Sequence, residues 1–270
     1  MNNLLKKLSY LHRAEIQRAI DAFGLDHPAT ADAYDDIGMS NKKSGNYNNA
    51  LACFEMALNI RKEILDKPRS GSNIISHIYL ASIAHSYIHL AECYTDLGNS
   101  EKALEYYDSA IKYGLKALEA QQGNPKKDDL QIANTYDFLG AAYSLTKDFD
   151  NAIKYKLKAL DLQEMILDKN DRDIIESCFS LAVDYSRIKD NDNVIKYCQK
   201  VLQMQNDISD KDNKLSGATY EILAQSYLIA NEYSKALQSC EKALNIYESL
   251  GDIDSANFIK QLIAEIKQKL

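Results

Sequence analysis

The sequence predicts an all-α protein: a right-handed α-α superhelix of about five antiparallel helix pairs, with a further helix at each end. Two observations support this fold class. The 270 residues include only 10 Gly and 3 Pro, whereas β-sandwiches and barrels need many turns rich in these residues. In addition, one sequence pattern recurs along almost the whole chain, and such internal repetition is typical of solenoids.

The first helix of each predicted pair carries three residues at i, i+4 and i+7. They are a large anchor, a small residue and a third residue that is usually Tyr: Tyr34/Gly38/Asn41, Tyr87/Ala91/Tyr94, Tyr136/Gly140/Tyr143, Cys178/Ala182/Tyr185 and Tyr220/Ala224/Tyr227. This spacing lies on one face of a helix. The small residue within it lets a second helix approach closely.

The second helix of each pair begins near a small hinge residue, which stands sixteen residues after the anchor. A second small residue follows seven positions later: Ala50/Ala57, Ala103/Ala110, Ala152/Ala159, Val194/Val201 and Ala236/Ala243. Spacing inside the copies is constant, while the distance between copies varies. Each copy is therefore interpreted as one helix pair, which must stack on its neighbours to bury both faces.

These copies predict repeats at about 31–66, 84–121, 133–168, 175–207 and 217–249, within a single solenoid over 1–270. An apolar stripe predicts an N-terminal helix over 3–22. A second stripe predicts a C-terminal capping helix over 252–269, as solenoids require for solubility. The Gly-, Pro- and Ser-containing segments 67–73 and 121–127 are predicted loops, and the helix after the first is expected from about Ile74.

The order of aromatic anchor, Leu-Gly pair, Tyr, Ala, aromatic residue and Ala resembles the tetratricopeptide repeat. Leu139, Gly140 and Tyr143 match that pattern well, and the resemblance covers almost the whole chain. The 42-residue spacing of the later copies and the linker DHPATADAYDDIG (26–38) are similar to the kinesin light chain subfamily. The resemblance implies a protein-binding role, in which the first helices line a concave groove.

The candidate partner-binding residues lie on the first helices at positions that do not face the paired helix. They are Asp36, Met39, Lys43, His85, His89, Glu92, Asp96, Phe138, Phe179, Val183 and Ile222. Charged residues come mainly from the first two copies and apolar residues from the last three. Such a groove suits a partner peptide or an amphipathic helix with apolar anchors. The alternative is that the apolar members simply pack between neighbouring first helices.

Peptide-binding members of the kinesin light chain subfamily carry an Asn just before the Leu-Gly pair, where it grips the peptide backbone. In this sequence the same column reads Asp36, His89, Phe138, Ser180 and Ile222. We therefore expect side-chain burial, rather than contacts to a peptide backbone, to dominate recognition.

Four polar residues, His85, His89, Glu92 and Asp96, follow one predicted helix face at i, i+4, i+7 and i+11. Two His residues at i, i+4 are able to chelate a divalent metal, but the HExxH order of metalloproteases is absent. A pH-sensitive groove and an ordinary solvated surface are the other interpretations. No metal site is predicted.

Composition and missing motifs narrow the function further. A net charge of −7 disfavours nucleic-acid binding. No apolar run reaches the roughly 18 residues of a membrane span, and the N-terminal residues lack a signal sequence, so we expect a cytoplasmic protein. Five widely spaced cysteines predict reduced, buried thiols. The common nucleotide-binding and nucleophile motifs are missing, so neither catalysis nor a cofactor is predicted.

Two functional classes remain. The first is a non-catalytic scaffold or adaptor that binds another protein. The alternative is a peptide-responsive regulatory sensor, similar to bacterial tetratricopeptide proteins, that acts through a partner in trans. Self-association through the apolar C-terminal helix is a further prediction for either class.

Overall fold

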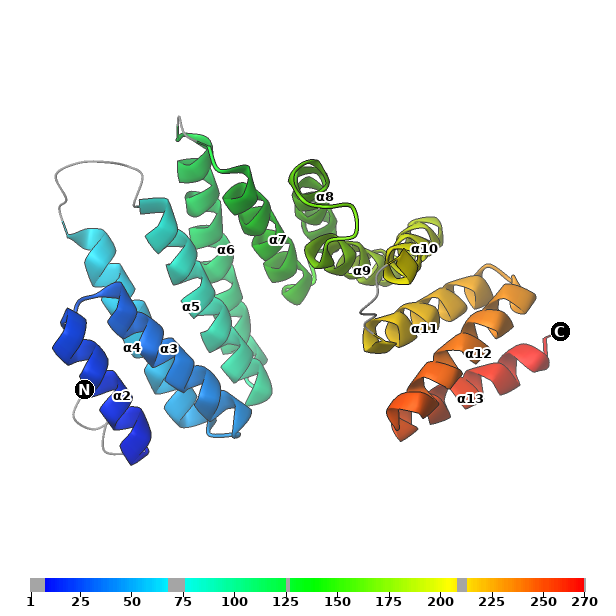
Figure 1. Ribbon diagram of the computed structural model, residues 1–270, viewed down its shortest axis with the longest axis horizontal. Coiled ribbons are helices and arrows are strands. Elements are labelled where there is room, and N and C mark those ends of the chain that lie inside the picture. The colour runs from blue at the N-terminus through cyan, green and yellow to red at the C-terminus, as the bar shows by residue number, and fades with distance from the viewer. Residues whose placement is uncertain (1–7, 68–75, 125–126, 208–212, 270) are drawn as a thin grey trace. The chain divides into compact units, whose positions relative to one another are not determined.

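The computed structural model describes residues 8–67, 76–124, 127–207 and 213–269, which form twelve helices and no strand. The all-α prediction is confirmed. The chain divides into two compact units, Met1–Lys147 and Asp148–Leu270 (Figure 1). The first unit holds α2 (Tyr10–Phe23), α3 (Pro28–Lys43), α4 (Tyr47–Asp66), α5 (Ser76–Asp96), α6 (Ser100–Gln122) and α7 (Asp129–Leu145). The second holds α8 (Phe149–Ile166), α9 (Arg172–Arg187), α10 (Asn191–Asp207), α11 (Asn213–Ile229), α12 (Tyr233–Leu250) and α13 (Ile253–Lys267).

Contacts between helices follow the order of the chain. The predicted pairs α3/α4, α5/α6, α9/α10 and α11/α12 pack together, and within each unit each pair also contacts the helix that follows it. The third predicted pair, α7 and α8, falls on either side of the boundary between the units. The prediction of one solenoid over 1–270 therefore stays a prediction.

Helix starts differ from the predicted repeat bounds by several residues. The first helices begin three to eight residues earlier. In three of them the N-cap lies upstream of the apolar stripe: His27 caps α3, Asp128 caps α7 and Asp171 caps α9. The N-terminal helix, predicted from residue 3, is described only from Tyr10, where the Ser9 hydroxyl accepts a hydrogen bond from the His12 amide. Residues 1–7 and the predicted loop residues 68–73, 125 and 126 lie outside the described residues.

Small residues at the predicted positions allow the two helices of a pair to touch. The Phe54 ring of α4 covers Gly38 of α3, and a Cβ at residue 38 would lie 2.5 Å from the Phe54 Cε1 atom. Ala91, Ala182 and Ala224 are fully buried at the equivalent positions. The predicted stripe is thus the contact surface between the paired helices.

The turn inside each repeat reuses one backbone conformation. A residue with positive φ stands five positions before every hinge residue: Gly45, Gly98, Lys147, Lys189 and Asn231, with φ between 60° and 74°. In four of these turns the next amide bonds to the carbonyl of the third stripe residue, as in Asp190 N to Tyr185 O at 3.0 Å. This left-handed cap closes the first helix and reverses the chain.

In the second unit, a buried ion pair between α8 and α9 stands where other repeats have uncharged residues. Lys156 of α8 and Asp184 of α9 are each 3% exposed, and Lys156 Nζ donates to Asp184 Oδ2 at 2.6 Å. Equivalent positions in other repeats hold Phe54, Tyr107, Cys198 or Cys240 for the lysine, and Ser40, Cys93, Ala142 or Ser226 for the aspartate. The pair ties the third repeat to the fourth in a single register.

All five cysteines are free and buried, as predicted. The C-terminal helix α13 buries Ala256, Ile259, Leu262 and Ile266 against the preceding core and leaves its opposite face polar for the most part. Within the described ranges, no helix combines the length and apolar character that crossing a membrane requires.

We predict that Lys189→Gly stabilises the protein by about 0.5–1 kcal/mol, because glycine adopts positive φ without the steric cost of a Cβ. Urea unfolding of the variant measures the change. Lys196→Gly, the same replacement inside α10, is the matched control and should destabilise by about 1 kcal/mol. Destabilisation by both variants would contradict the turn described here.

We predict that Asp184→Ala alone destabilises by about 3–5 kcal/mol, since it leaves the Lys156 ammonium buried without its counter-ion. The double variant Lys156→Cys/Asp184→Ala, which copies the residues of other repeats, should lie within about 2 kcal/mol of the wild type. Equal losses in the single and double variants, measured by chemical denaturation, would argue against a buried ion pair.

Candidate functional site

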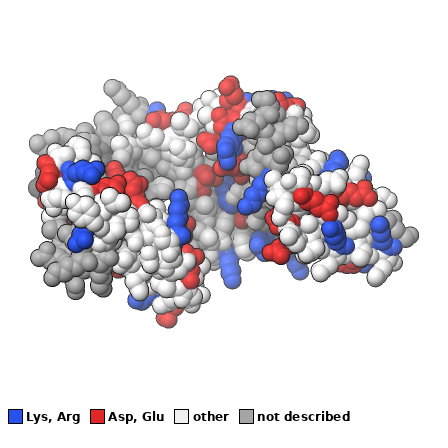
Figure 2. Space-filling model, turned by 60° about the horizontal axis from the view of Figure 1, so that its bottom comes forward, with Lys and Arg blue, Asp and Glu red and all other residues white. Residues whose placement is uncertain are grey.

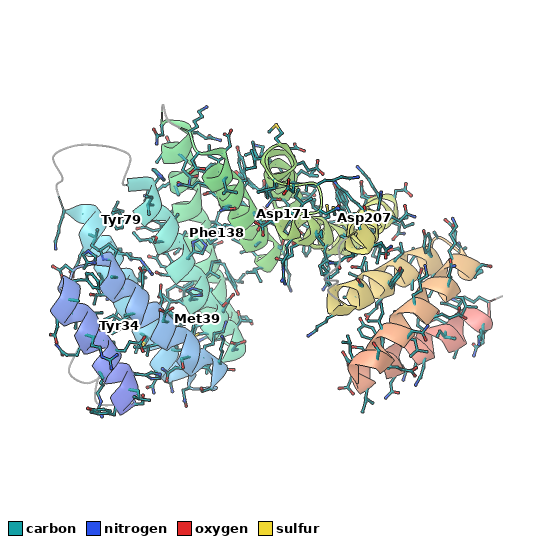
Figure 3. The ribbon with its side chains drawn as sticks, in the orientation of Figure 1. Tyr34, Met39, Tyr79, Phe138, Asp171 and Asp207 are labelled. Carbon is teal, nitrogen blue, oxygen red and sulfur yellow. The ribbon has the colours of Figure 1, made fainter. Side chains whose placement is uncertain are left out.

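The predicted partner-binding residues lie on the first helices of the repeats. We call the surface of α3, α5 and α7 the first-helix face of the first unit, and that of α9 and α11 the first-helix face of the second. Asp36, Lys43, His85 and Asp96 are exposed. Met39, His89, Glu92, Phe138, Phe179, Val183 and Ile222 are only partly exposed. Figure 3 labels Met39 and Phe138.

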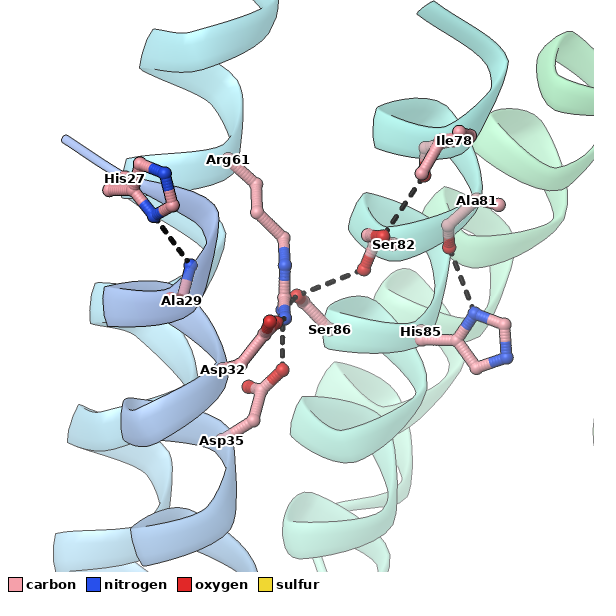
Figure 4. Close-up of polar contacts among 10 residues, drawn as sticks. All are labelled: His27, Ala29, Asp32, Asp35, Arg61, Ile78, Ala81, Ser82, His85 and Ser86. Carbon is pink, nitrogen blue, oxygen red and sulfur yellow. Dashed lines mark hydrogen bonds and ion pairs between the residues drawn. The ribbon is translucent and has the colours of Figure 1, made fainter. Parts of the chain in front are cut away.

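A buried arginine joins three helices beside this face. Arg61 of α4 is 6% exposed and donates to Asp32 at 2.7 Å, to Asp35 and, at 2.6 Å, to the Ser86 hydroxyl of α5 (Figure 4). Asp32 is largely exposed, while Asp35 is mostly covered. Burial raises the pKa of Asp35 to about 6, although Arg61 opposes that rise. The guanidinium therefore holds α3, α4 and α5 together through three hydrogen bonds.

Sequence reasoning missed this cluster, although the repeat alignment contains its signal. The position eleven residues after each hinge holds Arg61, Gly114, Gln163, Gln205 and Tyr247, all of which are buried. From the second repeat onward, the position before each anchor holds a buried hydroxyl residue: Ser86, Thr135, Ser177 or Thr219. Ser177 donates to Gln163 at 2.8 Å, which repeats the Arg61–Ser86 contact in another joint. Polar contacts at these positions therefore link the first repeat to the second and the third to the fourth.

Lys42, the neighbour of the predicted partner-binding residue Lys43, bridges α3 and α5. Its Nζ atom lies 2.5 Å from Glu92 and 3.9 Å from Asp96. Burial alone would lower the pKa of Lys42, but the hydrogen bond and charge of Glu92 raise it above its ordinary value. Glu92 and Asp96 thus take part in an ion-pair network within the protein, while Lys43 points into solvent.

The two predicted histidines have different environments. His89 stacks on Phe54, with ring centroids 5.0 Å apart, and its Nδ1 atom is buried without a hydrogen-bond partner. His85 is exposed; its Nδ1 bonds to the Ala81 carbonyl at 2.9 Å, and its ring contacts Phe138 of α7 at 4.6 Å. His85 and Phe138 therefore meet on the first-helix face, whereas His89 lies partly beneath it.

Burial lowers the pKa of His89 from its ordinary 6.5 to about 4. The charged or titratable groups that act on it are Glu92, His85, Lys42 and Arg61. His89 is consequently neutral near pH 6.5, where an ordinary histidine titrates, so it does not supply the pH-sensitive groove that was one interpretation of the sequence. Among the described residues, no three His, Cys, Asp or Glu side chains converge as metal ligands.

The apolar candidates contribute to the cores as well as to the surface. Phe138 packs against the core around Leu90 and reaches Gly114 of α6. In the second unit, Phe179 and Ile222 pack against the core that contains Leu181 and Leu223. The packing alternative therefore applies to these three residues, although each stays partly exposed.

The cysteine thiols offer no activated nucleophile. Burial raises the pKa of Cys53 and Cys198 to about 12, and that of Cys93, Cys178 and Cys240 to about 11. They stay protonated at neutral pH, and a thiol reacts as its thiolate. On the face drawn in Figure 2, acidic and basic side chains are interspersed.

Comparison with known families identifies the repeat. Three tetratricopeptide repeat models match the sequence: one over 107–165 and 174–249, another over 84–113 and a third over 30–69. A search of curated proteins finds no match.

Solved structures share the fold at low sequence identity. The crystal structure of BtubC (BKLC) from P. vanneervenii has 17% identity and a TM-score of 0.67, with 92% of each chain covered. A Podosopora anserina putative kinesin light chain with nearly identical TPR-like repeats has 16% identity and a TM-score of 0.59, covering 83% of this chain and 98% of that one. The crystal structure of the apo form of RapI has 14% identity and a TM-score of 0.54, and the match covers 96% of this chain and 68% of the RapI chain. At these identities the likeness establishes the fold alone.

We predict that His89→Phe flattens the pH dependence of stability between pH 6.5 and 4. The folded-state pKa of His89 lies below the unfolded one, so its contribution is fully present above pH 6.5 and is lost as the pH falls toward 4. The free energy of unfolding of the wild type should therefore fall by about 2–3 kcal/mol more than that of the variant across this range. A difference between the two proteins that stays constant from pH 7 to pH 4.5 would contradict a buried, neutral His89.

Proposed function

Because the chain belongs to the tetratricopeptide repeat family, we propose that it is a non-catalytic scaffold that binds a partner peptide or helix on its first-helix face. Family membership supports a protein-interaction role in general. The finer assignment, to particular residues of the first-helix face, is our proposal.

One observation carries the choice of surface. On the first unit, Asp36, Lys43 and His85 project from two neighbouring first helices, α3 and α5, without serving the core behind them. The residues beneath them hold the helices in place through the Arg61 cluster and the Lys42–Glu92 pair. Exposed polar and aromatic side chains on rigid elements are suited to recognition, because their geometry is fixed before a partner arrives.

Partly exposed apolar side chains add a means of anchoring the partner. Met39 and Phe138 lie on the same face as His85, and Val183 and Ile222 are partly exposed on the first-helix face of the second unit. A peptide that covers these residues gains apolar burial, while the exposed charges select its polar residues. We place the partner's apolar anchors over Met39 and Phe138 in the first unit.

Site-specific photo-crosslinking tests the surface without disturbing the cores. We predict that a benzoylphenylalanine at Asp36 or His85 captures the same partner from native lysate, since both positions are exposed on the proposed face. The adducts are identified by mass spectrometry. A substitution of Phe138 or Phe179 by Asp would be less informative, because both side chains also pack against a core.

The matched control is the same crosslinker at Lys112, an exposed position on the second helix α6. It should yield background adducts only. Capture at Lys112 but not at Asp36 or His85 would place recognition on the second-helix side and would overturn the assignment.

A further inference from the structure

A cleft of about 560 Å³ opens in the second unit, away from its first-helix face. It lies between the second helices α8 and α10, with the start of α9 as part of its floor. Figure 3 labels Asp171, the N-cap of α9, and Asp207, the last residue of α10, which mark the helix ends beside it. Its volume falls within the roughly 300–1,000 Å³ of sites that hold small ligands.

The floor of the cleft is apolar. Ile174 and Met204 are 1% and 4% exposed, and the partly buried Leu167 completes the surface. A methionine adapts its shape to different apolar groups, because its thioether chain is unbranched and polarisable. An aliphatic or aromatic side chain inserted here would remove its own apolar surface from water, because it would pack against a floor that is itself almost entirely buried.

The rim of the cleft is charged, with both signs represented. Lys200 of α10 pairs with Glu164 of α8, which joins the two helices at one side. Lys169 and Asp207 are exposed, and neither has an ion pair or a hydrogen bond within the described ranges. They leave one positive and one negative group available to a ligand at the mouth of an apolar cleft.

From this arrangement we infer that the cleft binds a short peptide segment that presents one apolar side chain between an anionic and a cationic group. The apolar side chain fills the Leu167–Ile174–Met204 floor. The anionic group meets Lys169, and the cationic group meets Asp207. A purely apolar ligand would gain nothing from the two rim charges, which stay solvated, and a charged group placed in the cleft would lose its hydration against an apolar floor. The scaffold then holds a second ligand, independently of its first-helix face.

Methyl NMR of the whole chain tests the site directly. The protein has five methionines, so labelling them with ¹³C-methyl gives few signals, and Met204→Leu assigns the one in the floor. The probes are Ac-Glu-Leu-Lys-NH₂, Ac-Lys-Leu-Glu-NH₂ and the uncharged Ac-Gly-Leu-Gly-NH₂. We expect one charged peptide to shift the Met204 signal saturably, and the uncharged peptide to bind at least about tenfold more weakly, a difference of about 1.4 kcal/mol. The signals of Met39 and Met56, in the other unit, should not move.

Charge-reversal variants test whether Lys169 and Asp207 recognise the peptide, as opposed to the net charge of the protein. Lys169→Glu and Asp207→Lys should each weaken the preferred peptide at least about fivefold, and the double variant should prefer the peptide of opposite charge order. Glu241→Lys, at an exposed position of α12, is the matched control and should leave binding unchanged. A Met204 signal that no charged peptide moves, or equal binding of charged and uncharged peptides, would overturn the proposal.

If Ac-Lys-Leu-Glu-NH₂ is the preferred peptide, the zwitterionic tripeptide Ala-Leu-Ala, whose free termini have the same charge order, distinguishes the two sources of such a ligand. Binding comparable to that of the preferred capped peptide would assign the site to free short peptides. Binding only of the capped peptides would assign it to an internal segment of a protein. Neither result depends on partner capture at the first-helix face, so the two proposals stand or fall separately.

Discussion

Close approach between the two helices of a repeat is the constraint on which the rest of the structure depends. Gly38 leaves no room for even a methyl group beneath Phe54, and fully buried alanines take its place in other repeats. Since an overpacked helix pair must separate or shift, the small residue fixes the distance between its helices. The left-handed turn then fixes their direction. Together they decide where the first-helix face presents its side chains.

Polar side chains in buried positions distinguish repeats that otherwise share one pattern. Arg61 and Gln163 occupy the same position of the second helix, and each bonds to a serine hydroxyl of the next first helix, whereas Tyr247 at that position donates to Glu221 of its own repeat. In the second unit, Lys156 and Asp184 stand where other repeats have small or aromatic residues. A charge left without its counter-ion is costly to bury, so these pairs penalise any stacking that would offset the repeats. They favour one register where they occur, between the first and second repeats and between the third and fourth.

Much of the fold could be predicted from the sequence, because apolar periodicity reports directly on burial. The anchors, the small residues and the buried cysteines lie where they were expected. The first residues of the helices were harder to predict. His27 and Asp128 cap their helices through local hydrogen bonds, which leave no apolar periodicity in the sequence. The sequence around Arg61 does not distinguish a buried arginine from a solvated one. Only comparison with the equivalent position of the other repeats indicates that it is buried. Phe138 and Ile222 were ambiguous for a similar reason: an apolar residue at the edge of a stripe serves both core and surface.

The order of helix contacts also bears on how the chain folds. Packing within each unit joins helices that are neighbours in sequence, so few contacts require distant segments to find one another. Low contact order of this kind is associated with rapid folding, because little loop entropy is lost before each contact forms. Once one helix pair has folded, the next pair packs on it through contacts between segments that are close in sequence. Hydrogen exchange should accordingly report protection that is graded along each unit, rather than one all-or-none opening.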